Sequence, residues 1–253
     1  MKDGHPRDER LRDFRNFLFL VWKNVGLPEP TWVQYDFAEY LQNGPDRVVL
    51  EAYRGMGKSW ITSAFVVWTL YWDPTKNILV VSASKSHADD LSTFILQIIR
   101  TVPGCEFLDC VGRDRHSKIA FDVGPAPPSK QPSVKSVGVT GQMTGSRADI
   151  VLADDVESLN NSLTQNGRDL IAELIKEFDA IVKPGGRVVF LGTPQTEQSI
   201  YNLLPSRGYT VRVWPIEFPD PGLVAVQRDT LAPEILRRLD VEVARPGEPV
   251  DPK

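Results

Sequence analysis

The sequence contains only two cysteines, Cys105 and Cys110, which excludes a disulfide framework as the basis of the fold. Together with His116 they fall short of the four ligands of a closed zinc site, so we interpret them as reduced thiols. An excess of basic residues is also lacking. The 29 lysines and arginines against 33 acidic residues give a net charge of −4. This charge argues against broad coating of nucleic acid but leaves room for a local basic groove.

Long apolar runs are absent as well. No stretch approaches the roughly 18 apolar residues that cross a bilayer, and the first ten residues are polar and charged, unlike a secretory leader. We therefore expect a soluble, intracellular protein without membrane contact. The length of 253 residues and the hydrophobic content of 42% are sufficient for one sizeable core.

Short buried-strand patterns alternate with helical patterns along the chain. Helices are predicted over 11–25, 31–41, 58–72, 84–101 and 161–182, the last ended by Pro184-Gly185-Gly186. Strands are predicted over 47–53, 77–82, 149–153, 187–191 and 209–213, with a short helix before the last one. Two further segments, 118–123 and 133–139, flank a proline-rich loop and predict an antiparallel insertion or sheet edge. This alternation indicates an α/β fold with a mostly parallel central sheet flanked by helices.

The first chemical motif lies between the strand at 47–53 and the helix at 58–72. Residues 52–59 match the phosphate-binding loop G-x-x-x-x-G-K-[ST] except at the first position, where Ala52 replaces glycine. The loop amides and the helix N-terminus would bind phosphate oxygens, Lys58 would contact the β and γ phosphates, and Ser59 would ligate Mg²⁺. We therefore predict ATP and Mg²⁺ as ligands. The predicted ATP-binding residues of the loop are Ala52, Tyr53, Arg54, Gly55, Met56, Gly57, Lys58 and Ser59.

A second motif is the apolar strand that ends in acidic residues at 154–157. Carboxylates at the carboxyl end of a strand face the ligand crevice of an open α/β sheet. We predict Asp154 as the Mg²⁺ carboxylate and either Asp155 or Glu157 as the general base for the attacking water. The alternative interpretation is an acidic cap on the following helix.

Taken together, five segments resemble the ATPase half of the large terminase subunit of tailed double-stranded-DNA phages, of the short-tailed type. They are YRGMGKS (53–59), VSASK (81–85), PSVKSVGVTGQMTGSRAD (132–149), ADDVE (153–157) and LGTPQ (191–195). The resemblance spans nearly the whole chain. It implies a P-loop NTPase of the ASCE, RecA-like class that hydrolyses ATP to move double-stranded DNA into a procapsid.

The resemblance also implies roles for single residues. Arg54 matches an arginine inside the phosphate loop, with an exposed turn arginine as the alternative. Arg147 is the best match for an arginine that acts in the site of a neighbouring subunit; Arg113 and Arg115 remain open, and an ion pair of Arg147 with Asp149 is the structural alternative. Thr193 in the LGTPQ motif matches a residue that senses the γ-phosphate, unless the motif is a plain strand-end turn.

Adenine recognition is implied at Gln34, whose amide both donates and accepts hydrogen bonds. Trp32 or Tyr35 is a candidate for stacking on the base. Ser84 and Lys85 follow the second strand, near DNA in similar motors, although Ser84 could equally cap the next helix.

The expected organisation is an N-terminal helical segment (1–45) that contributes to the adenine site, a P-loop ATPase core (46–215), and a C-terminal extension ending in a linker or mobile tail (216–253). Because the chain stops after this extension, we expect no nuclease activity from it. The implied partners are double-stranded DNA, the portal protein, the small terminase subunit and further copies in a ring, a pentamer on the portal. The implied location is the host cytoplasm, with transient docking on the procapsid. The alternatives are a helicase-like DNA-dependent ATPase and a non-hydrolysing nucleotide-binding assembly module.

Overall fold

The computed structural model describes residues 4–157, 164–193 and 199–251. Seven strands in this part of the chain form one sheet in the order β3-β4-β2-β5-β6-β1-β7. The strands are β1 (Arg47–Ala52), β2 (Ile78–Ser82), β3 (Ala120–Phe121), β4 (Val134–Gly138), β5 (Ala148–Asp154), β6 (Val182–Gly192) and β7 (Thr210–Trp214). All neighbouring pairs are parallel except β3 and β4. The predicted α/β class with a mostly parallel sheet and a short antiparallel edge is therefore confirmed.

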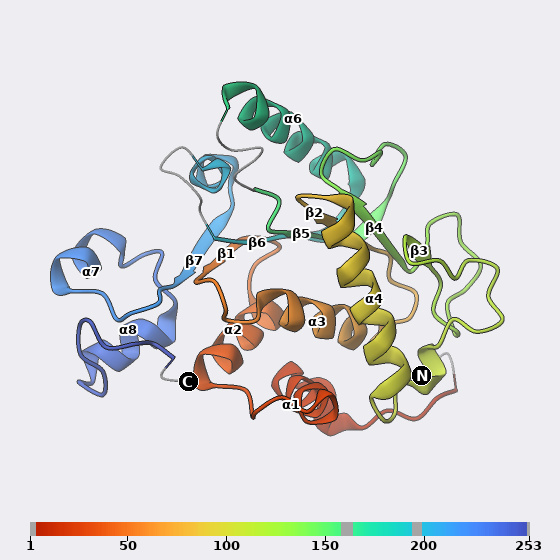
Figure 1. Ribbon diagram of the computed structural model, residues 1–253, viewed down its shortest axis with the longest axis horizontal. Coiled ribbons are helices and arrows are strands. Elements are labelled where there is room, and N and C mark those ends of the chain that lie inside the picture. Colours follow the sequence, from red (N-terminus) through yellow and green to blue (C-terminus); the bar gives the residue numbers. More distant parts are fainter. Residues whose placement is uncertain (1–3, 158–163, 194–198, 252–253) are drawn as a thin grey trace.

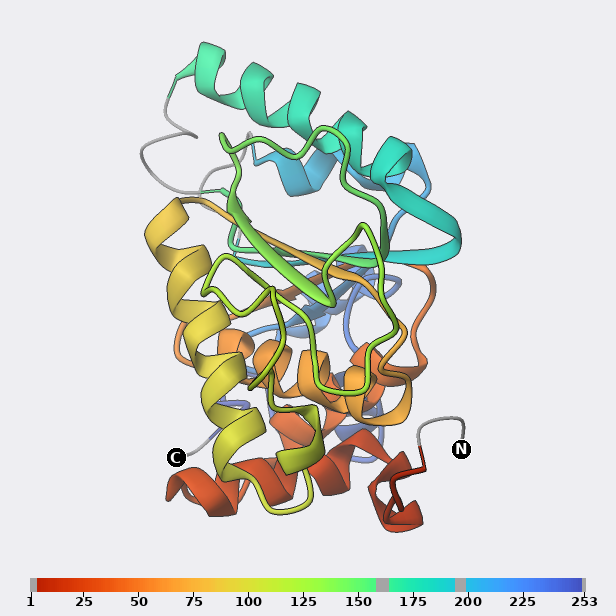
Figure 2. The ribbon, with the colours of Figure 1, turned by 90° about the vertical axis from the view of Figure 1, so that its right-hand side faces the viewer.

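Helices cover both faces of this sheet (Figures 1 and 2). One face carries α1 (Phe14–Val25), α2 (Trp32–Asn43), α3 (Lys58–Trp72) and α4 (Lys85–Thr101), and the opposite face carries α6 (Gln165–Ile181). Two short helices, α7 (Pro221–Gln227) and α8 (Pro233–Asp240), lie beyond β7. Among the described residues, no helix combines the length and the apolarity that crossing a bilayer requires.

Alternating side chains of the strands explain the two cores. On β1, Val48 and Leu50 point into the core beneath α1–α4, whereas Val49 points into the core beneath α6. Successive strand residues face opposite sides, so a strand buried on both faces is apolar throughout. This accounts for the continuous apolar runs in the sequence.

The helices on the α3 face begin and end where their sequences direct. Ser84 caps α4 by accepting a hydrogen bond from the backbone N–H of His87 at 3.3 Å, so its N-cap role is confirmed. Gly26 ends α1 with φ of 75°, a left-handed conformation that favours glycine. The indole N–H groups of Trp68 and Trp72 both donate to the carbonyl of Leu11, which fastens the N-terminal segment to α3.

Three details differ from the sequence-based expectation. Strand β6 starts at Val182, directly after α6, so Pro184-Gly185-Gly186 lie inside the strand and do not form a loop after the helix. The helix expected over 161–182 is described from Gln165 to Ile181, and its first expected residues lie outside the described part. The short helix expected between β6 and β7 consists of 3-10 turns at Ile200–Leu203 and Pro205–Arg207.

A further difference concerns the C-terminus. Residues 244–251, which read as a linker or mobile tail, pack against the segment 216–218. Ala244 and Val250 are buried there. The apolar side chains are too few and irregularly spaced to signal this packing in the sequence, because it depends on backbone hydrogen bonds rather than on a periodic pattern.

Candidate nucleotide-binding site

The loop between β1 and α3 has the backbone of an anion-binding turn. Gly55 has φ of 97° and Gly57, which precedes the first residue of α3, has φ of 89°. Glycine adopts these left-handed values without the steric cost of a Cβ atom. The loop therefore ends at the N-terminus of a 15-residue helix, where free N–H groups attract phosphate oxygens.

Lys58 is buried inside this loop, with 6% of its surface exposed. Its Nζ donates to the carbonyl oxygens of Ala52 at 3.0 Å and Tyr53 at 3.4 Å, and to Oγ1 of Thr193 at 3.0 Å. Burial lowers the pKa of Lys58, against the raising effect of Asp155 and Asp154. A buried ammonium group held only by neutral oxygens can exchange them for anionic phosphate oxygens.

Thr193 lies at the carboxyl end of β6 and is part of the same hydrogen-bond set. Its Oγ1 donates to the carbonyl of Ala52 at 2.8 Å and accepts from Lys58. The predicted γ-phosphate sensor is thus in contact with the predicted phosphate-binding lysine. Pro194 and Gln195, which complete the sequence motif, lie outside the described residues.

Ser59 and Asp154 meet across the site, 95 positions apart in the chain. Ser59 Oγ donates to Asp154 Oδ2 at 2.9 Å. Asp154 is 4% exposed, and its Oδ1 has no hydrogen-bond partner among the described residues. Burial, and then the neighbouring charge of Asp155, raise the pKa of Asp154 to about 7. A hydroxyl beside a carboxylate with an unused buried oxygen fits Mg²⁺, which prefers oxygen ligands.

Asp155 follows with φ of 43°, the left-handed region that a non-glycine residue adopts at a cost. Its backbone N–H donates to the carbonyl of Leu191 at 2.8 Å. Asp155 lines a pocket of about 330 Å³ together with Arg54, Gly55, Gly57, Lys58, Ser59, Trp60 and Thr193. The structure therefore brings the loop, Arg54, Asp155 and Thr193 around one cavity.

Glu157, the other candidate base, has a different environment. It is 3% exposed, its Oε2 accepts a hydrogen bond from Ser199, and its Oε1 has no partner among the described residues. Glu157 does not line the cavity that Asp155 lines. Which of the two acts as the base stays open, although Asp155 has direct access to the cavity.

Glu51 was missed in the sequence. It is the last residue of β1 before Ala52, in register with Gly192. Burial, and then the charge of Glu157, raise the pKa of Glu51 to about 7. An acidic residue within an otherwise apolar strand is the signal that could have singled it out, because charged side chains are rarely buried without a reason.

Gln34 lies against the loop from the α2 side. Its Nε2 donates to the carbonyl of Met56 at 2.8 Å, and its Oε1 accepts from the backbone N–H of Thr31 at 3.0 Å. The predicted adenine-reading amide is therefore beside the phosphate loop, with each end of the amide bonded to the chain. Trp32 stacks on Phe218, which gives this candidate a partner within the core. The role of Gln34 in base recognition stays a prediction.

Arg147 is not near this cavity. It directly precedes β5 and donates from Nη1 to the carbonyl of Ala180. Asp154 ends the same strand. At about 3.3 Å per residue, the length of β5 separates Arg147 from Asp154 by roughly 20 Å. Arg147 and the cavity therefore lie at opposite ends of the sheet.

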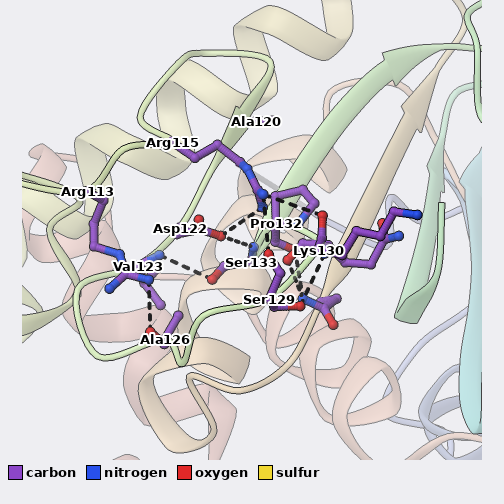
Figure 3. Close-up of polar contacts among 12 residues, drawn as sticks. Arg113, Arg115, Ala120, Asp122, Val123, Ala126, Ser129, Lys130, Pro132 and Ser133 are labelled. Carbon is purple, nitrogen blue, oxygen red and sulfur yellow. Dashed lines mark hydrogen bonds and ion pairs between the residues drawn. The ribbon is translucent and has the colours of Figure 1, made fainter. Parts of the chain in front are cut away.

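The two alternative arginines are used within their own loop (Figure 3). Arg113 donates to the carbonyl of Ala126 at 2.9 Å, and Arg115 contacts Asp122 at 3.4 Å. Arg115 also donates to the carbonyls of Ser129 and Lys130. These contacts fix the proline-rich loop beside β3, which accounts for both arginines structurally.

A larger groove of about 760 Å³ opens beside Ser59 and Asp154, between α3 and α4. Ser59, Asp154 and Asp155 lie along it, and Trp60 and Phe94 give it an aromatic wall with ring centroids 4.4 Å apart. The site is therefore open on the α4 side as well as above the loop.

Comparison with known proteins identifies the family. Over 211 residues the chain is 53% identical to the large terminase subunit of Enterobacteria phage T3. The aligned region covers 82% of this chain and 36% of that protein. This chain belongs to the large terminase subunits. It spans about a third of the length of the terminase from phage T3. No protein-family model matches the sequence.

Solved structures agree on the fold of this terminase chain. The large terminase of bacteriophage HK97 superimposes with a TM-score of 0.55 at 14% identity, over 83% of this chain and 45% of that one. A DEAD box protein from the hyperthermophile Methanococcus jannaschii gives a TM-score of 0.50 at 11% identity, over 77% and 52%. These structures confirm the predicted P-loop ATPase fold, and the identity to the phage T3 protein confirms the predicted family.

Proposed function

We propose that this chain is the ATP-hydrolysing motor domain of a viral terminase that translocates double-stranded DNA into a procapsid. The observation that carries the proposal is the contact between Ser59 and Asp154 beside Lys58. It joins the phosphate loop to the acidic strand end in the arrangement that phosphoryl transfer requires. Membership of the large terminase subunits supports the DNA-packaging role.

The residues around the cavity support a division of labour. Lys58 would exchange the oxygens of Ala52 and Thr193 for β and γ phosphate oxygens of ATP. Ser59 and Asp154 would hold Mg²⁺, which neutralises phosphate charge when bound. Asp155, or alternatively Glu157, would accept the proton of the attacking water. Arg54 would add positive charge at the γ-phosphate, and Thr193 would register its loss.

Arg147 would act in a neighbouring copy. Its place at the opposite end of the sheet from Asp154 leaves it without a role in its own cavity. If it acts in trans, Arg147→Ala and Lys58→Ala chains, each inactive alone, regain hydrolysis when mixed, because one supplies an intact loop and the other an intact arginine. Absence of any regain on mixing at concentrations where the chains assemble would count against this role.

The proposed partners follow from the same function. They are double-stranded DNA, the portal protein, the small terminase subunit and further copies of this chain in a ring, a pentamer on the portal. The work would take place in the host cytoplasm, with the ring docked transiently on the procapsid. No nuclease role is proposed for the residues of this cavity.

The deciding experiment measures ATP hydrolysis against protein concentration, with and without double-stranded DNA. We expect Mg²⁺-dependent hydrolysis that increases with protein concentration and with double-stranded DNA, and that is abolished in Lys58→Ala. Stimulation by single-stranded but not double-stranded DNA would favour the helicase-like alternative. Tight ATP binding without turnover at any concentration would favour the non-hydrolysing assembly module.

A further inference from the structure

The C-terminal strap, defined here as residues 244–251, forms a short ladder with the segment 216–218. The backbone N–H of Gly247 donates to the carbonyl of Phe218 at 2.8 Å, and that of Val250 donates to the carbonyl of Ile216 at 2.9 Å. Val250 is 1% exposed. These bonds bring the next residue, Asp251, to the start of α2, where its carboxylate meets Thr31.

Asp251 accepts two hydrogen bonds on one carboxylate oxygen. Its Oδ2 lies 3.2 Å from the phenol oxygen of Tyr53 and 3.1 Å from Oγ1 of Thr31, and both hydroxyls donate to it. Tyr53 belongs to the phosphate loop, and Thr31 immediately precedes α2. One side chain near the end of the chain therefore joins two segments of the nucleotide site that are distant from it in sequence.

Both segments lead directly to the phosphate loop. The carbonyl of Tyr53 accepts from Nζ of Lys58 at 3.4 Å. On the other side, the backbone N–H of Thr31 donates to Gln34, which in turn donates to the carbonyl of Met56. Asp251 thus supports the loop at two positions, Tyr53 and Met56, on either side of Gly55.

The chemistry of the pair suits a lasting contact. Burial, and then the charge of Asp251, raise the pKa of the Tyr53 phenol well above its usual value. The phenol remains protonated and able to donate at any physiological pH. Hydrogen bonds to a charged acceptor are among the stronger ones in proteins.

We propose that Asp251 is a positioning residue of the nucleotide site: through Tyr53 and Thr31 it holds the phosphate loop in the shape that receives ATP. The inference rests on the proposed ATPase function and assigns to the C-terminal strap a part in nucleotide affinity. Asp251 does not line the cavity, so its effect is on binding rather than on the chemical step.

The test compares Asp251→Ala with Asp251→Asn. Alanine removes the shared acceptor, and we expect KM for ATP to rise about fivefold to tenfold, since a hydrogen bond to a charged group contributes a net free energy of this order. We expect kcat to change less than about twofold, because the loop residues that contact phosphate are all retained. Asparagine keeps a carbonyl oxygen for both hydroxyls but loses the charge, so it should raise KM less than alanine does.

Tyr53→Phe tests the same contact from the loop side, and Asp240→Ala is the matched control. Asp240 is a carboxylate of the same C-terminal region, and its ion-pair partner among the described residues is the exposed Arg228, at 3.0 Å. We expect Tyr53→Phe to raise KM. When it is combined with Asp251→Ala, KM should rise little further, because both changes remove the same contact. Asp240→Ala should leave KM unchanged. Thermal unfolding of each variant checks that the fold is intact.

Unchanged KM in both Asp251→Ala and Tyr53→Phe would overturn the proposal, as would an Asp251→Asn variant as impaired as Asp251→Ala. A lowered unfolding temperature without any change in KM would show a merely structural contact. If the parent chain hydrolyses no ATP, the proposed function fails by itself. The role of Asp251 is then still measured from the Kd of the non-hydrolysable analogue AMP-PNP, which should follow the same pattern.

Discussion

Carboxylates at the two ends of the parallel sheet differ in how completely they are hydrogen-bonded. At the amino end, the Asp149 carboxylate accepts from the backbone N–H of Asn77 and from Nζ of Lys183, both at 2.8 Å, and Lys183 also donates to Oδ1 of Asn77 at 2.7 Å. At the carboxyl end, Asp154 and Glu157 each bury an oxygen that has no partner among the described residues. The Asp149 carboxylate is satisfied by the chain itself, whereas the two carboxylates at the carboxyl end each have an oxygen left for a ligand.

The contrast shows how stability and function are separated in this fold. Buried polar groups are normally hydrogen-bonded, so an incomplete set marks a ligand site rather than a structural one. Asp155, in a left-handed conformation, lies at the same end. Changes at the carboxyl end should therefore affect catalysis, and changes at the amino end should affect folding.

The largest expected effect is at Asp154. Asp154→Asn keeps an oxygen for the Ser59 hydroxyl but removes the charge that would hold Mg²⁺, so ATP hydrolysis should fall at least about a hundredfold. Because burial raises the pKa of Asp154 to about 7, ionising it by pH 8 lowers the stability of the folded chain, and the variant should unfold at an equal or higher urea concentration without Mg²⁺. A variant that is both active and less stable would contradict the assignment.

At the amino end the expectation is reversed. Asp149→Ala removes the carboxylate that accepts from Lys183 and from the N–H of Asn77, so the free energy of unfolding should fall by about 1–3 kcal/mol. The kinetic constants for ATP should not change, since the residue lies a full strand length from the cavity. Urea unfolding measures the stability and steady-state hydrolysis measures KM. If the change in KM, expressed as a free energy, exceeded the change in the free energy of unfolding, the two ends would not differ as we propose.

The Asp149 carboxylate should also make the stability of the fold depend on pH. Burial alone would raise the pKa of Asp149, but the hydrogen bonds from Lys183 and Asn77 hold it below its usual value. A carboxylate with a lowered pKa stabilises the fold at pH values above its unfolded pKa of about 4, and this contribution is lost as the pH falls through its folded pKa. The stability difference between the parent chain and Asp149→Asn should therefore shrink below about pH 4. A constant difference down to pH 2 would exclude this explanation.

The smallest expected effect is at Glu51. Burial, and then the charge of Glu157, raise the pKa of this carboxyl to about 7. A raised pKa makes the folded chain lose stability as the pH rises from about 4.5 to about 7, because the folded carboxyl retains its proton over this range. Glu51→Gln removes that loss and should be more stable than the parent by about 1–2 kcal/mol at pH 8, with little difference at pH 4. Urea unfolding at the two pH values measures the effect. Equal destabilisation at both would show that Glu51 makes a structural contact instead.

The sequence was sufficient for the parts of the fold whose signals are local. The helix at Lys58–Trp72 and the strand ending at Asp154 were predicted nearly to the residue, because glycine, Asp73-Pro74 and a run of apolar residues bound them. The same local patterns gave the phosphate loop and the acidic strand end, which the structure brings into contact through Ser59 and Asp154.

What could not be predicted depends on contacts between distant segments. Nothing near Pro184-Gly185-Gly186 indicates that this turn-like sequence bulges out within β6, where Val182 pairs with Ala148 and Arg187 pairs with Ile150 on β5. The burial of Glu51 and the docking of Asp251 onto Tyr53 and Thr31 likewise depend on residues far away in sequence.

The central claim is that nucleotide binds at the carboxyl end of the sheet. One lysine from each end, Lys58 at the carboxyl end and Lys183 at the amino end, offers the most direct comparison. A calorimetric titration with Mg²⁺ and AMP-PNP would measure Kd for the parent chain, for Lys58→Ala and for Lys183→Ala. We predict one binding site per chain in the parent and in Lys183→Ala, with similar Kd, and at least about a tenfold weaker Kd in Lys58→Ala, because a charge-assisted contact to phosphate is lost. Equal affinity of Lys58→Ala and the parent chain would contradict the account.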